Sequence, residues 1–299
     1  MLSGTSFCER PESVLRGKTT AAVSDSTPYT VIEGIRCFSP EVARTYSDYP
    51  DGGFELTDRS GDDSFWVRSR NRLFKRIVYD QLAPTGKTKL LEIGCATGSF
   101  IRQIVENERL EITGSEIYLK GLLYAKKNLP NVDFIQFDVT KGEIGEKFDL
   151  IVAFDVIEHI ESDVAAISNI GKMLHDRGGL ILTVPQHMFL WSKLDELVKH
   201  KRRYSRRELE TKLRNNGFDI IYCTSFVFVL FPFMLISRML DKSRKHVQSD
   251  EMALEKRVTF PKALNWIFDL VMRVDESLIR WGVSLPWGGT LVAVARKRL

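Results

Sequence analysis

Short apolar runs alternate with helical patterns through the middle of this 299-residue chain, and this alternation limits the possible folds strongly. The runs have strand length, and apolar residues recur at helical spacing between them. Such alternation predicts an α/β fold in which a doubly wound, mostly parallel sheet of seven strands has helices on both faces. The predicted strands are Lys89–Ile93, Glu111–Ser115, Asp133–Phe137, Phe148–Phe154, Leu180–Val184, Phe218–Cys223 and Thr290–Ala295.

The same patterns predict how the chain is organised. Residues 1–30 are rich in Ser and Thr without periodicity, and we expect a disordered tail there. Residues 31–86 are predicted to form a helical cap region, and residues 87–223 the sheet core. Residues 224–288 would be an apolar and helical insertion before the last strand, within residues 289–299. The predicted core helices are Asp63–Gln81, Ser99–Asn107, Leu119–Asn128, Asp163–Leu174 and Arg206–Asn216.

The first predicted core strand runs into a glycine-containing turn, GCATG at residues 94–98, and then into a helix. Glycine allows the backbone to turn sharply and to approach a ligand closely, and a helix N-terminus offers unpaired N–H groups. A dinucleotide site requires G-x-G-x-x-G, but position 99 is Ser, which counts against a dehydrogenase. Glu92 would be unfavourable beside a pyrophosphate and suits a cationic amino-acid ligand instead.

Acidic residues also end the next two predicted strands. Glu116 follows the second strand, where a carboxylate can accept hydrogen bonds from both ribose hydroxyls. Asp138 follows the third strand, where it can accept a bond from an adenine amino group. An acidic residue at one strand end is often only solvated. Acids at these intervals on successive strands predict a nucleoside-binding site.

These segments resemble the motifs of class I S-adenosylmethionine-dependent methyltransferases. LLEIGCATG resembles the first motif of that family, Glu116 the second, FDVT the third, FDLIVAFDVIEHI the fourth, and GGLILTVP the strand that follows. The resemblance covers roughly residues 65–223 and implies a Rossmann-like fold with S-adenosylmethionine as the cofactor. Ala96 departs from the family pattern, which usually has glycine there, and its methyl group would narrow the turn slightly.

The resemblance also implies roles for individual residues. The first motif would hold the methionine part of the cofactor and Glu116 the ribose. Asp138 and Val139 would bind the adenine, and Phe154 and Asp155 would lie near the sulfonium. The cofactor-binding residues predicted in this way are Glu92, Gly94, Cys95, Ala96, Gly98, Glu116, Ile117, Asp138, Val139, Phe154 and Asp155.

A sulfonium is already an activated methyl donor, so the protein must mainly align the acceptor and exclude water. A hydroxyl acceptor would also use a general base. The predicted catalytic residues are Asp155, His159 and His187. His159 has a suitable intrinsic pKa, but it could instead brace the cofactor pocket. His187 follows the fifth strand, where it would line the acceptor pocket or act as the base.

Basic residues are densest in VKHKRRYSRR, residues 198–207. These charges would either be solvated at the start of a helix or bind an anionic partner. The insertion contains an apolar segment, Phe226–Leu240, which is followed by a basic stretch. This segment would form either a lid over the acceptor or a peripheral membrane contact with anionic headgroups. A further helix, Phe260–Arg280, could add to either arrangement.

The formal net charge is only +4, so composition does not indicate a nucleic-acid partner. The four cysteines are scattered, without a CxxC pair or metal-ligand spacing to histidine, so we expect neither a disulfide framework nor a metal site. We see no secretory signal and no apolar run of membrane-spanning length. A cytoplasmic location is predicted, at the inner face of the membrane if the insertion makes a membrane contact.

The segments VPQHMFLWSKLDELVKHKRRYSRREL, FVLFP and LPWGGTLVAVARK resemble one bacterial branch of these enzymes, the small-molecule methyltransferases of types 11 and 12. That branch is associated with cell-envelope glycan and lipid biosynthesis. The resemblance implies methyl transfer to a small-molecule, glycan or lipid-linked acceptor, with O-methylation favoured. One alternative is a catalytically inactive, cofactor-binding scaffold. The other is an RNA methyltransferase, although the fourth motif reads DVIEHI and not the NPPY pattern of amine methylation.

Overall fold

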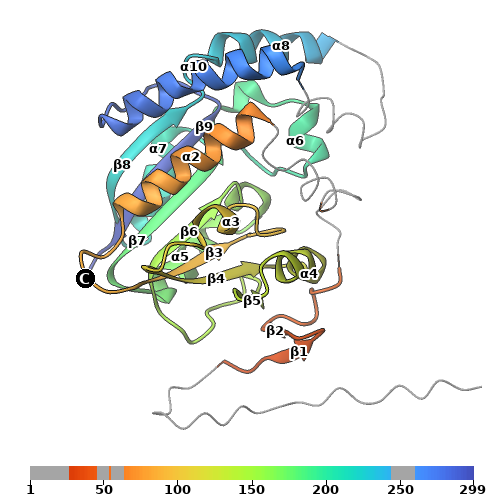
Figure 1. The fold of residues 1–299 in the computed structure, drawn as a ribbon, viewed down its shortest axis with the longest axis vertical. Coiled ribbons are helices and arrows are strands. Elements are labelled where there is room, and N and C mark those ends of the chain that lie inside the picture. Colours follow the sequence, from red (N-terminus) through yellow and green to blue (C-terminus); the bar gives the residue numbers. More distant parts are fainter. Residues whose placement is uncertain (1–26, 46–53, 55–63, 244–259) are drawn as a thin grey trace, which may run out of the picture.

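A single mixed β-sheet crosses the computed structural model, which describes residues 27–45, 54, 64–243 and 260–299. Most of the predicted N-terminal tail lies outside these residues. The sheet has nine strands in the order β1-β2-β5-β4-β3-β6-β7-β9-β8 (Figure 1). Their bounds are β1 Thr30–Ile32, β2 Ile35–Cys37, β3 Thr88–Ile93, β4 Leu110–Glu116, β5 Asp133–Gln136, β6 Phe148–Phe154, β7 Leu174–Pro185, β8 Phe218–Phe226 and β9 Thr290–Lys297. The predicted fold class is confirmed, and β3–β9 correspond to the seven predicted strands.

The strand order reverses between β3 and β6. β3 pairs in parallel with β4 on one side and with β6 on the other. β4 and β5 therefore extend the sheet in one direction from β3, and β6 begins its extension in the opposite direction. In open α/β sheets the crevice at such a reversal, beside the carboxyl ends of the strands, is where ligands bind. β9 is antiparallel to both β7 and β8 and lies between them.

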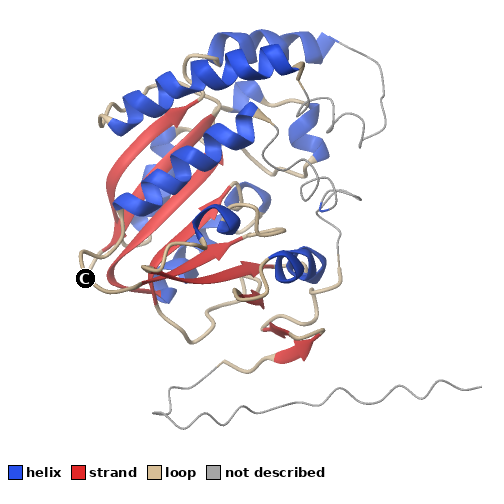
Figure 2. Ribbon diagram, viewed as in Figure 1, coloured by secondary structure: helices blue, strands red, loops and turns tan. Residues whose placement is uncertain are grey.

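Helices cover both faces of this sheet (Figure 2). Their bounds are α2 Phe65–Asp80, α3 Ile101–Ile104, α4 Leu119–Asn128, α5 Asp163–Met173, α6 Lys193–Leu197, α7 Arg206–Asn215, α8 Phe231–Ser243 and α10 Lys262–Arg280, with 3-10 turns η2 Ile157–His159 and η3 Met188–Leu190. The predicted helix Ser99–Asn107 is reduced to the short α3. Gly98 has φ +77°, so the residues before α3 form turns.

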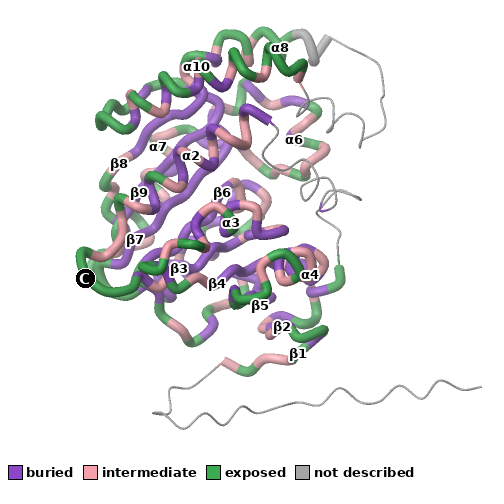
Figure 3. The backbone as a smooth tube through the Cα atoms, viewed as in Figure 1, coloured by how far each residue is buried: buried purple, intermediate pink, exposed green. Residues whose placement is uncertain are grey.

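The sheet divides the apolar core into two layers because successive strand residues face opposite sides. Leu90, Val152 and Ile181 pack with α2 and α10 on one side. Their chain neighbours Leu91 and Leu182 pack with α5 and α7 on the other. The central strands are buried along nearly their whole length (Figure 3). A parallel sheet covered on both faces accounts for the continuous apolar runs in the sequence.

The N-terminal region differs from the helical cap that was predicted for residues 31–86. β1 and β2 form an antiparallel hairpin, and β2 adds to the sheet in parallel beside β5. Glu33 and Gly34 connect the two strands with φ angles of +51° and +77°. Positive φ at both central residues defines the tight turn that suits a two-residue hairpin. Each strand has only three residues, which is too short to show a period of two.

The apolar insertion also differs from the single segment that was predicted. β8 extends to Phe226, and the side chains of Phe226, Val227 and Leu230 are buried in the core beside α2 and α10. Among the described residues of the insertion, α8 and α10 are the helices that project beyond the sheet, and they lie on the same side of the molecule as α2 (Figure 1).

Candidate active site

The glycine turn follows β3 at the strand reversal. Gly94, Ala96 and Gly98 all have positive φ, at +71°, +47° and +77°. A Cβ atom at Gly94 would overlap the Val156 side chain, so glycine is required there for space as well as for conformation. Ala96 adopts the left-handed conformation despite its Cβ, which costs on the order of 1 kcal/mol. The backbone N–H of Cys95 donates to the Ser115 carbonyl at 2.9 Å, which ties the turn to β4.

Glu116 lies against this turn at the end of β4. Its carboxylate accepts hydrogen bonds from the backbone N–H groups of Ala96 at 3.1 Å, Ile117 at 2.8 Å and Tyr118 at 3.4 Å. Burial raises the pKa of Glu116, and these three donors oppose that effect. The fold therefore brings the predicted ribose-binding carboxylate and the predicted methionine-binding turn together.

Asp138 occupies the same edge of the sheet, beyond the end of β5. Its Oδ1 accepts hydrogen bonds from the backbone N–H of Thr140 at 2.9 Å and from the Thr140 hydroxyl at 2.7 Å. The backbone N–H of Asp138 donates to Ser39 Oγ at 3.2 Å, so the N-terminal hairpin region supports this residue. Val139 is buried in the core, and its carbonyl accepts a bond from Asn169 Nδ2 at 2.9 Å.

Glu92 is a buried acid near the end of β3, two residues before Gly94. Its Oε2 atom has no hydrogen-bond partner among the described residues. Burial raises its pKa to about 8, although the Arg70 charge lowers it, and the Glu116 charge raises it further. A buried carboxylate oxygen without a donor is costly, and an ammonium group brought by a ligand would satisfy it. The residues therefore fit the amino-acid end of S-adenosylmethionine.

Asp155 follows β6 and is held between two elements. Arg70 of α2 forms an ion pair with its Oδ2 at 3.1 Å, and the Thr183 hydroxyl donates to its Oδ1 at 3.0 Å. Arg70 also acts electrostatically on Glu92, while its own buried Nε has no hydrogen-bond partner among the described residues. Arg70 was not predicted as a site residue, because the apolar spacing that predicts its helix gives no signal for a charged residue.

Phe154 ends β6, and its ring packs against two other aromatic rings of the core. The ring stacks on Phe74 with centroids 4.3 Å apart and contacts Phe100 edge-on at 4.8 Å. Phe154 is therefore a core residue beneath α2, and its position near the sulfonium stays a prediction.

The two candidate histidines have different surroundings. His187 follows β7, and its ring stacks on Phe189 at 4.8 Å and lies near Phe231 and Trp287. Its Nε2 is buried without a hydrogen-bond partner in the described structure, and burial together with Arg203 lowers its pKa. His159 instead lies edge-on to His200, with ring centroids 4.7 Å apart.

The basic run before α7 mostly makes internal contacts. Arg203 is buried, donates from Nε to Asp195 at 2.7 Å and donates to the Gln186 carbonyl. Arg202 pairs with Asp163 at 3.1 Å. Arg206 is the first residue of α7, where a positive charge is unfavourable because it faces the positive end of the helix dipole. Its guanidinium donates to the Ser284 hydroxyl and to the Leu285 carbonyl, and these two bonds offset that cost. These contacts account for much of the cluster without an external anion.

Glu92 leads to a testable pH dependence. Its folded pKa of about 8 exceeds its ordinary value of 4.5, so its stabilising contribution is complete below pH 4.5 and is lost as pH rises through about 8. We expect Glu92→Gln to raise the melting temperature of the ligand-free protein at pH 9 relative to wild type, and to change it little at pH 5. Thermal melts from pH 5 to 9 measure this difference, and a difference independent of pH would contradict it.

Proteins of known sequence are similar to this chain. A family model for the methyltransferase domain matches residues 59–222, which is more than half of the chain. A Mycobacterium tuberculosis protein named "Probable S-adenosylmethionine-dependent methyltransferase" is 22% identical over 169 residues, 55% of this chain and 60% of that protein. The malonyl-acyl-carrier-protein O-methyltransferase 1 of Ilyobacter polytropus is 26% identical over 153 residues, 47% of this chain and 56% of that enzyme. The chain therefore spans little more than half the length of these relatives.

Solved structures show the same fold. The phosphoethanolamine N-methyltransferase 2 of Haemonchus contortus, in complex with S-adenosyl-L-methionine, superposes with a TM-score of 0.52 at 16% identity, covering 85% of this chain and 59% of that one. At this identity the likeness concerns the fold alone. The family match, the strand order and the glycine turn with its acidic neighbours agree. The chain belongs to the methyltransferase domain family and has the Rossmann-like fold of S-adenosylmethionine-dependent methyltransferases.

Proposed function

We propose that this protein transfers a methyl group from S-adenosylmethionine to a hydroxyl group of a small-molecule, glycan or lipid-linked acceptor. The observation that carries the proposal is the buried Glu92 carboxylate with its unpartnered oxygen, beside a glycine turn that Glu116 holds. When bound, the cofactor supplies a methyl group on a positively charged sulfur. Glu92 would pair with its ammonium group, Glu116 would accept from the ribose hydroxyls, and Asp138 would accept from the adenine amino group.

Arg70 extends this assignment to the other end of the methionine part. It is the cation that faces both Asp155 and Glu92, and its Nε remains available in the described structure. A guanidinium suits a carboxylate because its N–H groups match the two oxygens. We assign Arg70 to the cofactor carboxylate, which would make α2 part of the binding site as well as its cover.

His187 is the favoured base for a hydroxyl acceptor. β6 and β7 are adjacent and parallel, so His187 lies at the same edge of the sheet as Asp155. Its lowered pKa keeps the ring neutral near pH 7, so that Nε2 can accept a proton from the hydroxyl. The Asp155 carboxylate is less suited to this role, because Arg70 and Thr183 already bind it.

Replacing His187 tests the catalytic assignment. We expect His187→Gln to lower turnover by about 100-fold to 10,000-fold, because general-base catalysis contributes this much. Affinity for the cofactor should change less than about twofold. The assay follows tritium from labelled S-adenosylmethionine into acceptors in a cell-envelope extract, and calorimetry follows cofactor binding. The exposed His175 provides the control His175→Gln, which should retain full turnover.

The outcomes of this assay separate the alternatives. Cofactor binding without any labelled product would favour an inactive scaffold. Label that disappears after ribonuclease treatment would favour an RNA methyltransferase. Turnover that survives His187→Gln at the wild-type level would remove His187 as the base while leaving methyl transfer in place.

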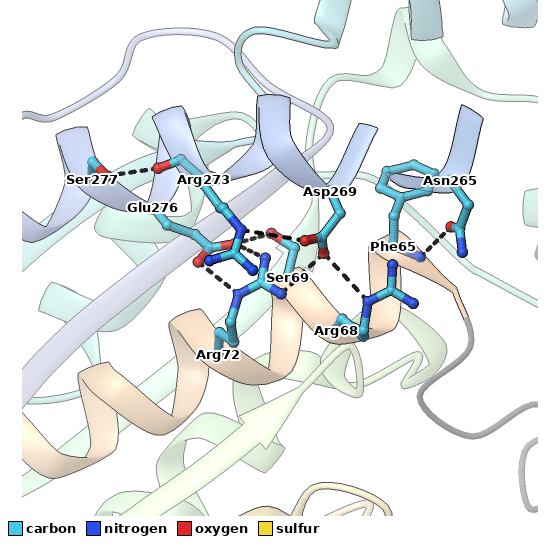
Figure 4. Close-up of polar contacts among 9 residues, drawn as sticks. All are labelled: Phe65, Arg68, Ser69, Arg72, Asn265, Asp269, Arg273, Glu276 and Ser277. Atoms are coloured by element: carbon cyan, nitrogen blue, oxygen red, sulfur yellow. Dashed lines mark hydrogen bonds and ion pairs between the residues drawn. The ribbon is translucent and has the colours of Figure 1, made fainter. Parts of the chain in front are cut away.

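The polarity of α10 supports a peripheral membrane contact as a second part of the proposal. Its protein-facing side combines the buried Met272 and Ile279 with acids. Asp269 pairs with Arg68, Arg72 and Arg273, and Glu276 pairs with Arg72 and Ser69 of α2 (Figure 4). Its outward side also carries large apolar side chains. A surface helix usually keeps such side chains on the side that faces the core, whereas α10 has them on both sides.

The exposed residues of α10 and its neighbour α8 suit an anionic lipid surface. Trp266 is 66% exposed and Leu270 is 53% exposed. The other large apolar side chains exposed on these helices are Phe233, Ile236, Met239, Leu264, Ile267 and Val274, with Trp281 directly after α10. The acids of α10 are buried or half-buried, so its exposed charges are basic, namely Lys262, Arg273 and Arg280. Tryptophan and basic residues on one apolar face are typical of helices that lie in a membrane interface.

No helix of the described residues has both the length and the hydropathy to cross a bilayer. The proposed contact is therefore with the surface. We expect Leu270→Asp to reduce binding to anionic liposomes at least several-fold in a flotation assay. Val164→Asp is the matched control, since Val164 of α5 is similarly exposed, at 47%, but lies on another helix. Dimerisation through this face, detected by sedimentation and abolished by Leu270→Asp without any liposome binding, would overturn the membrane assignment.

A further inference from the structure

Glu158, His159 and His200 form a cluster beyond the end of β6. One oxygen or nitrogen atom of each residue lies within 4.8 Å of those of the other two. Glu158 and His159 belong to η2, which comes directly after β6, whereas His200 comes from the segment between α6 and α7. The backbone N–H of Lys201 donates to the Glu158 carbonyl at 2.8 Å, and this bond joins the two segments.

The Glu158 side chain is fully buried and lacks hydrogen bonds. Both carboxylate oxygens are without a hydrogen-bond partner among the described residues. His200 Nε2 is 3.9 Å from Glu158 Oε1, which is too long for a hydrogen bond. Arg70 and Arg203 contribute charge nearby, but they bind Asp155 and Asp195. A buried carboxylate in this state is costly unless a cation joins it.

His200 is already oriented toward Glu158. Its Nδ1 lies 2.9 Å from Asp195 Oδ1, and a carboxylate can only accept, so Nδ1 carries the proton. Asp195 is itself buried and is held by Arg203 and the Ser192 backbone. In the neutral ring this leaves the Nε2 lone pair on the side of Glu158. Histidine ligands of metals are typically fixed in this way by a second carboxylate.

We propose that Glu158, His159 and His200 bind a divalent transition-metal ion, with Zn²⁺ as the representative. Two imidazoles with one carboxylate suit Zn²⁺ and its neighbours in the first row, whereas Mg²⁺ and Ca²⁺ prefer oxygen ligands. Ligand atoms around such an ion are about 3–3.5 Å apart, so the side chains would move inward by about 1 Å. The sequence-based expectation of no metal site considered cysteine, and this cluster contains none.

The metal would have positions left for an acceptor. If the proposed methyl transfer is correct, an acceptor hydroxyl bound to the ion would have a lowered pKa. Its proton would leave to His187 or to water. The oxygen would then attack the methyl carbon, a C–O bond would form, and the C–S bond would break to release S-adenosylhomocysteine. This consequence rests on the proposed function, whereas the metal site itself does not.

Metal binding can be measured without either cofactor or acceptor. The full chain is freed of metal with a chelator, equilibrated with Zn²⁺, Mn²⁺ or Mg²⁺, and passed through a desalting column. Elemental analysis should then find one Zn²⁺ per chain, and competition with a chromogenic chelator gives the affinity. We expect His200→Gln and Glu158→Gln each to weaken Zn²⁺ binding at least about tenfold. His175→Gln provides the matched control, because that histidine is exposed and remote from the cluster in the chain.

Thermal melts ensure that a folding defect is not mistaken for lost binding. Zn²⁺ should raise the melting temperature of wild type and of His175→Gln, but not that of folded Glu158→Gln. Equal Zn²⁺ retention by wild type and Glu158→Gln would overturn the proposal. Retention of Mg²⁺ in preference to Zn²⁺ would overturn the assignment to a transition metal. Zn²⁺ binding with no methyl transfer to any acceptor would leave the site in place and refute only the proposed function.

Discussion

Glu116→Ala is expected to weaken S-adenosylmethionine binding by at least about 100-fold in isothermal titration calorimetry. In the proposed complex the carboxylate accepts from two ribose hydroxyls, and each bond to a charged group is worth about 1.5–3 kcal/mol. Two such bonds correspond to about 100-fold or more in affinity. The side chain also holds the backbone N–H groups of Ala96, Ile117 and Tyr118, so truncation should loosen the glycine turn as well.

Two further variants separate these contributions. Glu111→Ala removes an exposed carboxylate from the same strand, so it should leave the affinity within about twofold of wild type. Glu116→Gln keeps an acceptor oxygen near the turn but loses the charge. Its affinity should fall between those of wild type and Glu116→Ala. An affinity of Glu116→Ala equal to that of wild type would refute the ribose assignment.

Gly94→Ala is expected to lower the melting temperature by about 4–10 °C and to abolish detectable cofactor binding. A side chain at positive φ costs about 1–2 kcal/mol. The new Cβ would also overlap Val156, whose branched side chain has few alternative rotamers, and such overpacking costs about 1–3 kcal/mol more. Each kcal/mol shifts the melting temperature of a protein of this size by about 2 °C.

Gly86→Ala is the matched control for this overlap. Gly86 has φ +77°, close to the +71° of Gly94, but a Cβ there would meet no atom within 4 Å. Gly86→Ala should therefore show only the conformational cost, about 2–4 °C, with normal cofactor binding. Equal shifts for the two variants in thermal melts would mean that the contact with Val156 does not matter.

Much of the fold could be predicted from local patterns. The strand Phe148–Phe154 and the helix Leu119–Asn128 have the predicted bounds, because their apolar residues are buried in a covered parallel sheet. Some other elements begin or end at different residues from those predicted, because their terminal residues are polar and show no apolar pattern. β7 begins at Leu174 and not at Leu180. Its first part contains the exposed polar residues His175 and Asp176, so it lacks the apolar run that predicts a buried strand.

The candidate site was predictable where its residues follow strands directly. Glu92, Glu116 and Asp138 lie near the ends of β3, β4 and β5, so a correct strand assignment places them at one edge. Arg70 and Ser39 reach the same edge from distant segments. No spacing rule connects these two residues to the motifs, because their contacts depend on how α2 and the N-terminal hairpin pack.

The sequence by itself determined the seven strands β3–β9, the glycine turn and the acids that follow the strands, because strand alternation and turn geometry are local properties of the chain. Only the tertiary structure decided which charges become partners. Packing of α10 on α2 turns its acids inward and leaves Trp266 outward. The segment before α7 brings His200 to a buried Glu158 from far along the chain. Burial and contacts between distant segments depend on all the elements at once, and a linear pattern does not record them.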